Sequence, residues 1–134
     1  MRRFACIVVL CLSIFSSFGK DKELDSLLLS LQHSEEDTHK VNLYIAVARK
    51  YYDKSMNQEA LQTADLLYQL ATSLRYEKGR IVYFNLTGRI QKNLGDYPEA
   101  QHRYLKALKM SEALKDTESI AGSYNNLGNL FILL

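Results

Sequence analysis

The chain has 134 residues, of which 47% are hydrophobic and 24% charged, so it is long enough for one domain and little more. With one proline and six glycines it has too few turn residues for a loop-rich β fold, and this composition favours an all-α protein. The formal net charge is only +2.

The first 19 residues have the pattern of a secretory signal. A basic start, Met1-Arg2-Arg3, precedes the twelve apolar residues 4–15, and Ser17 and Gly19 are the small residues that signal peptidase requires. We therefore expect cleavage after Gly19 and a periplasmic protein; an uncleaved anchor is the alternative, although spanning a bilayer takes about 20 apolar residues. The leader holds both cysteines, two arginines and no acid, so the mature chain has no disulfide and keeps 15 basic against 15 acidic residues. This balance removes the main support for nucleic-acid binding.

The next segment, residues 20–38, is predicted to be a capping helix and a loop. Leucines at 24, 27, 28 and 31 form one face of a helix over 21–32. The carboxylates of Glu35, Glu36 and Asp37 come just before the following helix. We interpret them as favourable charges at a helix N-terminus rather than as a cation site.

The rest of the chain repeats itself with a period of forty residues. Tyr44, Phe84 and Tyr124 coincide, as do Ala48, Gly88 and Gly128, and as do Arg49, Arg89 and Asn129. Apolar residues within each period recur at helical spacing and predict helices over 39–53, 57–74, 79–94 and 97–114, with another beginning near 117. The repeats therefore cover about 41–80, 81–120 and, in part, 121–134, and an array spans 39–134.

The clearest connection between two helices lies at 94–100. Gly95 is expected to take the left-handed conformation that ends a helix. Asp96 is expected to cap the next helix, with Glu99 completing a capping box and Pro98 in the first turn. The small residues Ala48, Gly88 and Gly128 are predicted to let paired helices approach closely, and tyrosines 44, 104 and 124 to lie in the core.

These residues resemble the tetratricopeptide repeat. Tyr124, Leu127-Gly128 and Phe131 match the first helix of the family pattern, and Gly95-Asp96-Tyr97, Ala100, Tyr104 and Ala107 match the second. Ala64 and Gln91 replace aromatic residues of the pattern. The resemblance implies an α-solenoid of antiparallel helix pairs, and the long period is similar to that of exported arrays in Bacteroidetes-type bacteria. Such arrays often form the periplasmic sensor region of a histidine kinase or regulator.

No enzyme or cofactor is predicted. Histidines 33, 39 and 102 are interpreted as surface or loop residues. Neither His39 nor His102 is followed by a metal ligand at i+3 or i+4, no cysteine remains after export, and no glycine-rich phosphate loop exists. The resemblance instead implies that the inner face binds a protein or peptide. The inward positions carried over from the family, together with Val82, are Asn42, Ile45, Arg49, Tyr52, Asn85, Arg89, Lys92, Asn125 and Asn129. Solvated polar positions without a ligand are the alternative.

The sequence ends on a helix for which no second helix follows, with Leu127, Phe131 and Leu134 expected to be uncovered. The first hypothesis is that the chain is a truncated N-terminal part of a periplasmic sensor region, attached to the membrane only through a missing downstream segment or an uncleaved leader. The second is a free-standing exported scaffold that forms a homodimer through Phe131 and Leu134.

Overall fold

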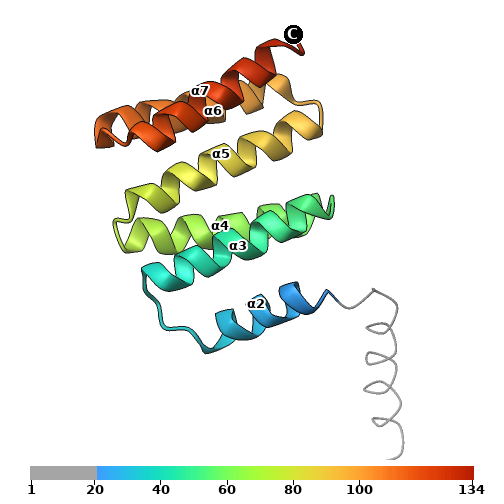
Figure 1. The fold of residues 1–134 in the computed structure, drawn as a ribbon, viewed down its shortest axis with the longest axis vertical. Helices are drawn as coiled ribbons and strands as arrows, with labels where there is room; N and C mark the ends of the chain where they lie inside the picture. The colour runs from blue at the N-terminus through green and yellow to red at the C-terminus, as the bar shows by residue number, and fades with distance from the viewer. Residues whose placement is uncertain (1–20) are drawn as a thin grey trace, which may run out of the picture.

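A computed structural model describes residues 21–134, and the predicted leader lies outside these residues. The described part is all-α. Its helices are α2 (Lys22–His33), α3 (Thr38–Asp53), α4 (Asn57–Ser73), α5 (Glu77–Asn93), α6 (Tyr97–Leu114) and α7 (Thr117–Phe131). Successive helices pack against each other along one axis, from α2 at one end to α7 at the other (Figure 1). The predicted α-solenoid is confirmed.

The predicted helices all exist, and their bounds differ from the prediction by at most two residues. The turn at Gly95 also forms as expected: Gly95 has φ +83°, and the Asp96 carboxylate accepts from the backbone N–H of Glu99 at 3.2 Å. The capping box is incomplete, because the Glu99 carboxylate accepts instead from Arg103 Nε at 2.7 Å. Ser55, Arg75 and Lys115 also have left-handed backbones, so a left-handed residue recurs every twenty residues, once in each turn from α3 to α7.

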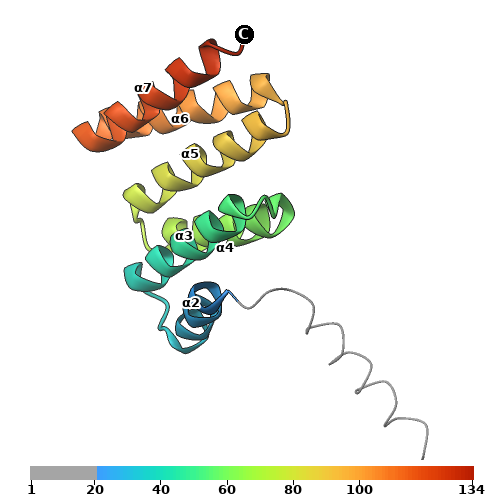
Figure 2. The same cartoon turned by 45° about the vertical axis from the view of Figure 1, so that its right-hand side comes forward.

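The helices form two layers. α5 contacts both α3 and α7, which are the first helices of the neighbouring repeats, whereas α4 and α6 pack only against the helices adjacent to them in the chain. Figure 2 shows α3, α5 and α7 following one another along the stack. The layer of first helices therefore presents a continuous surface made of one face from each repeat.

The closest approach between the layers occurs where Gly88 of α5 meets Tyr104 of α6. A Cβ atom added to Gly88 would lie 2.6 Å from Cε1 of the Tyr104 ring, and Tyr104 is only 1% exposed. Glycine is required here because the ring occupies the space of any side chain. Ala48, Ala60 and Ala100 are fully buried, in agreement with the predicted role of small residues.

Three expectations for the last helix are wrong. Tyr124 is 56% exposed rather than in the core, and nothing lies within 4 Å of a Cβ added to Gly128. Leu127, expected to be uncovered, is 5% exposed because it packs with Leu130 against Tyr104 of α6. Phe131 and Leu134 are 55% and 70% exposed. The common reason is that α7 contacts α5 and α6 on one side only within the described residues, so just the residues facing that side are buried.

α2 occupies the predicted capping position at the first end of the stack. It contacts only α3, and none of its residues is buried. Lys50 of α3 pairs with Glu23, and Lys54 Nζ lies 2.9 Å from Asp21 Oδ2. Asp21 also caps α2 by accepting from the backbone N–H groups of Glu23 and Leu24. Asp37 caps α3, as the preceding carboxylates indicated.

Gly88 and Gly128 occupy equivalent positions in the repeat and provide a matched pair of variants. Both lie inside helices, so replacement by alanine gains the same helix propensity of about 1 kcal/mol at each site. Gly88→Ala additionally forces the added methyl into the Tyr104 ring, which costs about 1–3 kcal/mol. Urea denaturation should therefore give Gly128→Ala a higher free energy of unfolding than Gly88→Ala by about that amount. Equal stability of the two variants would contradict the described packing.

Burial of Tyr104 predicts a loss of stability in alkali. Desolvation raises the pKa of the Tyr104 hydroxyl to about 12, so the unfolded chain releases this proton first, near pH 10. The contribution of the protonated, buried Tyr104 to the free energy of unfolding is complete below pH 10 and is lost as the pH rises from there to about 12. When the pH is raised from 9 to 11, the free energy of unfolding should fall in both proteins, and it should fall by about 1.4 kcal/mol less in Tyr104→Phe than in the wild type. The control variant Tyr124→Phe, which changes an exposed tyrosine, should lose as much unfolding free energy as the wild type over this pH range. Equal losses in all three proteins would be inconsistent with a buried, neutral Tyr104.

Candidate functional site

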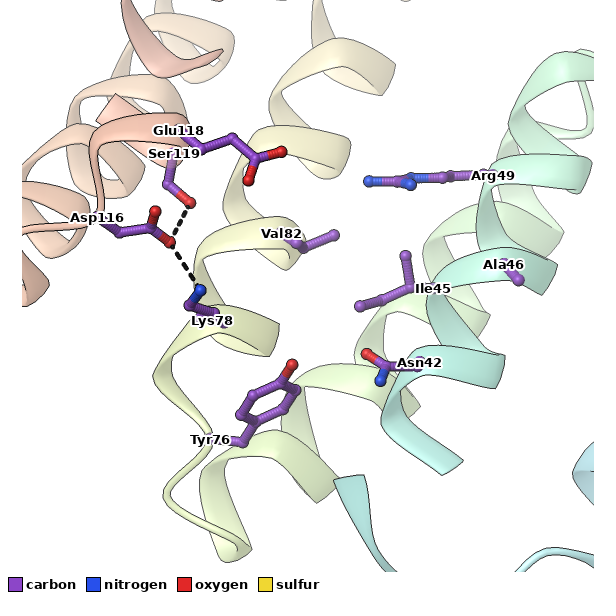
Figure 3. Close-up of a pocket in the computed structure, with 10 residues that line it drawn as sticks. All are labelled: Asn42, Ile45, Ala46, Arg49, Tyr76, Lys78, Val82, Asp116, Glu118 and Ser119. Atoms are coloured by element: carbon purple, nitrogen blue, oxygen red, sulfur yellow. Dashed lines mark hydrogen bonds and ion pairs between the residues drawn. The ribbon is translucent and has the colours of Figure 1, made fainter. Parts of the chain in front are cut away.

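The surface of the first helices contains two adjoining cavities of about 390 and 290 Å³. Arg49, Val82, Glu118 and Ser119 line both of them, so the cavities form one open channel, which we call the inner groove. α3 forms one wall, α7 the other, and α5 the floor. Figure 3 shows the larger cavity, with Arg49 and Ile45 of α3 on one side, Glu118 of α7 on the other, and Val82 of α5 between them.

Most of the residues predicted for the inner face line this groove. Asn42 and Ile45 line the larger cavity and Asn85, Arg89 and Asn125 the smaller, with Arg49 and Val82 in both. Tyr52, Lys92 and Asn129 line neither cavity. In the aligned column of Arg49, Arg89 and Asn129, the structure therefore brings the two arginines to one cavity and leaves Asn129 on the exposed part of α7.

Asn85 holds the floor of the groove to its α7 wall. Its Oδ1 atom accepts from Asn126 Nδ2 at 3.0 Å, and its Nδ2 donates to the buried Ser123 Oγ at 3.4 Å. Asn85 was predicted to contact a ligand, and in this structure its amide is used to join two helices. Asn126, which the sequence analysis did not single out as a site residue, completes this connection.

Tyr52 lies beneath Arg89 rather than in the groove. The guanidinium carbon of Arg89 is 4.5 Å from the centroid of the Tyr52 ring, and the Tyr52 hydroxyl accepts from Asn93 Nδ2 at 2.9 Å. A guanidinium stacked on an aromatic ring keeps its N–H groups directed outward in its plane, where they can donate to a carboxylate. Tyr52 therefore orients a residue of the groove.

The sequence analysis missed the acidic end of the groove. Lys78 of α5 lies 3.5 Å from Asp116 at the start of α7, and the Ser119 hydroxyl donates to the same carboxylate at 2.9 Å. This hydrogen bond, together with Lys78, lowers the pKa of Asp116. Glu118 follows in the first turn of α7. Lys78 precedes the predicted inward residue Val82 by four positions, and Glu118 precedes the predicted Asn125 by seven. Extending the inward positions by one or two helical turns toward the N-terminus would therefore have found both.

A third cavity, of about 240 Å³, lies on the opposite side of α5. Because an α-helix has about 3.6 residues per turn, Tyr83 and Phe84 point away from Val82, Asn85 and Arg89. The rings of Tyr68, Tyr83 and Phe84 pack together there, with centroids 4.5–5.6 Å apart. Arg103 donates to Glu99, to Tyr83 Oη at 3.2 Å and to Thr87 Oγ1 at 3.0 Å, so its guanidinium is bonded within the chain.

The groove offers amides, guanidiniums, carboxylates and an apolar floor. In residues 21–134, no group of three or more histidine, cysteine, aspartate or glutamate residues is placed to hold a metal ion. The side chains that line the groove can form hydrogen bonds and charge pairs. No helix in the same range is long and apolar enough to span a membrane. Compared with models of known families and with curated proteins, the chain gives no match.

The bridge between Asn85 and α7 can be tested by substitution. Asn85→Ala leaves the buried Ser123 hydroxyl and the Asn126 amide without these partners, which should cost about 1–2 kcal/mol of unfolding free energy. Asn125→Ala, on an exposed neighbour of the same groove, should change stability by less than about 0.5 kcal/mol. Thermal and urea unfolding followed by circular dichroism measure both. If Asn85→Ala is as stable as the wild type, the hydrogen bonds do not hold α7 in place.

Proposed function

We propose that the protein is a tetratricopeptide-repeat-like binding module that holds an extended segment of another protein in the inner groove. The single observation that supports this most directly is the continuity of the groove across α3, α5 and α7. A groove formed by one face of each repeat suits a ligand that is itself linear. The apolar floor at Ile45 and Val82 can receive side chains, while the surrounding amides can bond to an extended backbone.

The setting of this module is also part of the proposal. The leader pattern in residues 1–19 supports export, and the long repeat supports a role in the periplasmic sensor region of a signal-transduction protein. A sensor of this kind would bind its peptide or protein signal in the inner groove. We propose no catalytic role for the groove.

Selection from a random twelve-residue peptide library displayed on phage, with the purified protein as bait, tests the proposal. Val82 lines both cavities, so Val82→Trp should fill the groove and raise the Kd of the selected peptides by about tenfold or more. The matched control is Leu105→Trp, which adds the same ring at a position of α6 that is 48% exposed. This control should leave Kd within about twofold of the wild-type value. Selected peptides that are insensitive to Val82→Trp would contradict binding in the groove.

A further inference from the structure

Three charged side chains face the inner groove without an ion pair. They are Arg49 on α3, Arg89 on α5 and Glu118 on α7. Six ion pairs link charged residues in the described range, and none includes any of these three. Other surface charges also lack an ion pair. What distinguishes this set is that all three line a single cavity, from three different helices.

The two signs of charge lie on facing walls. Figure 3 shows the Arg49 side chain extending from α3 toward α7, and Glu118 extending from α7 toward α3, with Val82 between them. The two side chains do not pair with each other. Arg89 lies further along α5, and its orientation is set by stacking on Tyr52. The groove thus has a basic side, formed by the two arginines, and an acidic side at Glu118.

The polar side chains next to these three charges already form ion pairs or hydrogen bonds within the chain. Lys78 and Asp116 pair with each other, and Asn85 is bonded to Asn126 and Ser123. On the opposite side of α5, Arg103 donates to three oxygen atoms of its own chain. The charged residues that line the groove and form no ion pair in the described part of the chain are therefore Arg49, Arg89 and Glu118.

We propose that the inner groove selects an extended peptide segment that carries both an acidic and a basic side chain within a few residues of each other. The acidic side chain lies between Arg49 and Arg89, whose planar guanidiniums bind carboxylates with two parallel hydrogen bonds. The basic side chain pairs with Glu118. This inference rests on the proposed function, because it identifies the class of segment that the same groove binds.

The facing charges would act chiefly on specificity. A segment with acids at both positions places one carboxylate against Glu118, and a segment with bases at both positions places a cation against the arginines. Like charges brought together in this way raise the free energy of the wrong complex, so rejection contributes as much as attraction. The stacking of Arg89 on Tyr52 reduces the freedom that this side chain loses on binding.

The experiment repeats the peptide selection with charge variants as bait. The double variant Arg49→Gln with Arg89→Gln should lose the enrichment of aspartate and glutamate in the selected pool and keep that of lysine and arginine. Glu118→Gln should show the reverse. Lys109→Gln, on the exposed face of α6, removes one charge outside the groove and should select the same pool as the wild type. Circular dichroism confirms that each variant is folded.

The Kd values of individual peptides give a second readout. For a peptide selected by the wild type, changing its acidic residue to the amide should weaken binding about tenfold, equivalent to about 1.4 kcal/mol. The same change should have little effect on binding to the double arginine variant. This difference between the two baits would not arise from a purely structural role of the arginines.

The outcomes separate this inference from the proposed function. Suppose that the selected peptides bind Val82→Trp more weakly than the wild type, but that their pool has no preference for paired acidic and basic residues. The inference is then overturned and groove binding stands. A pool enriched in acids alone, unchanged by Glu118→Gln, likewise overturns it. If no peptide responds to Val82→Trp, the proposed function fails, and this inference fails with it.

Discussion

The contact between Gly88 and the Tyr104 ring sets how closely α5 and α6 approach, and α5 in turn positions both sides of the molecule. With no Cβ at Gly88, the ring lies directly against the α5 backbone and is itself almost completely buried. Tyr104 also packs with Leu127 and Leu130 of α7. One aromatic side chain therefore holds three consecutive helices, and the opposite face of α5 becomes the floor of the inner groove.

The two sides of α5 have different kinds of polar group. On the side of α4 and α6, Arg103 links Glu99 of its own helix to Tyr83 and Thr87 of α5, which suits a surface that holds the layers together. On the groove side, Arg49, Arg89 and Glu118 lack ion-pair partners in the described range, and Arg89 lies over the Tyr52 ring. Rigid support of unpaired charges is the arrangement that favours recognition of a charged ligand.

The helices and turns could be predicted from the sequence because their causes are local. The spacing of apolar residues, the left-handed Gly95 and the cap at Asp96 all act within a few residues. The errors concern long-range packing. Gly128 and Tyr124 share the repeat pattern of Gly88 and Phe84, yet a residue is buried only where another helix covers it. The candidate site was only partly predicted for a similar reason. The family resemblance placed Arg49 and Arg89 on the inner face, but the contacts of Tyr52 and Asn85 depend on partners in other helices. Glu118 reaches the groove only because α7 packs beside α5.

Every helix contacts only helices one or two places away in the chain. The contacts are consequently short in sequence separation, so loop closure costs little conformational entropy and low contact order favours rapid folding. Cooperativity in such an array passes from neighbour to neighbour, and stability is close to a sum of hairpin and interface contributions. We therefore expect order to spread from the interface between α5 and α6, the most extensive in the array, and to reach α2, which has no buried residue, last.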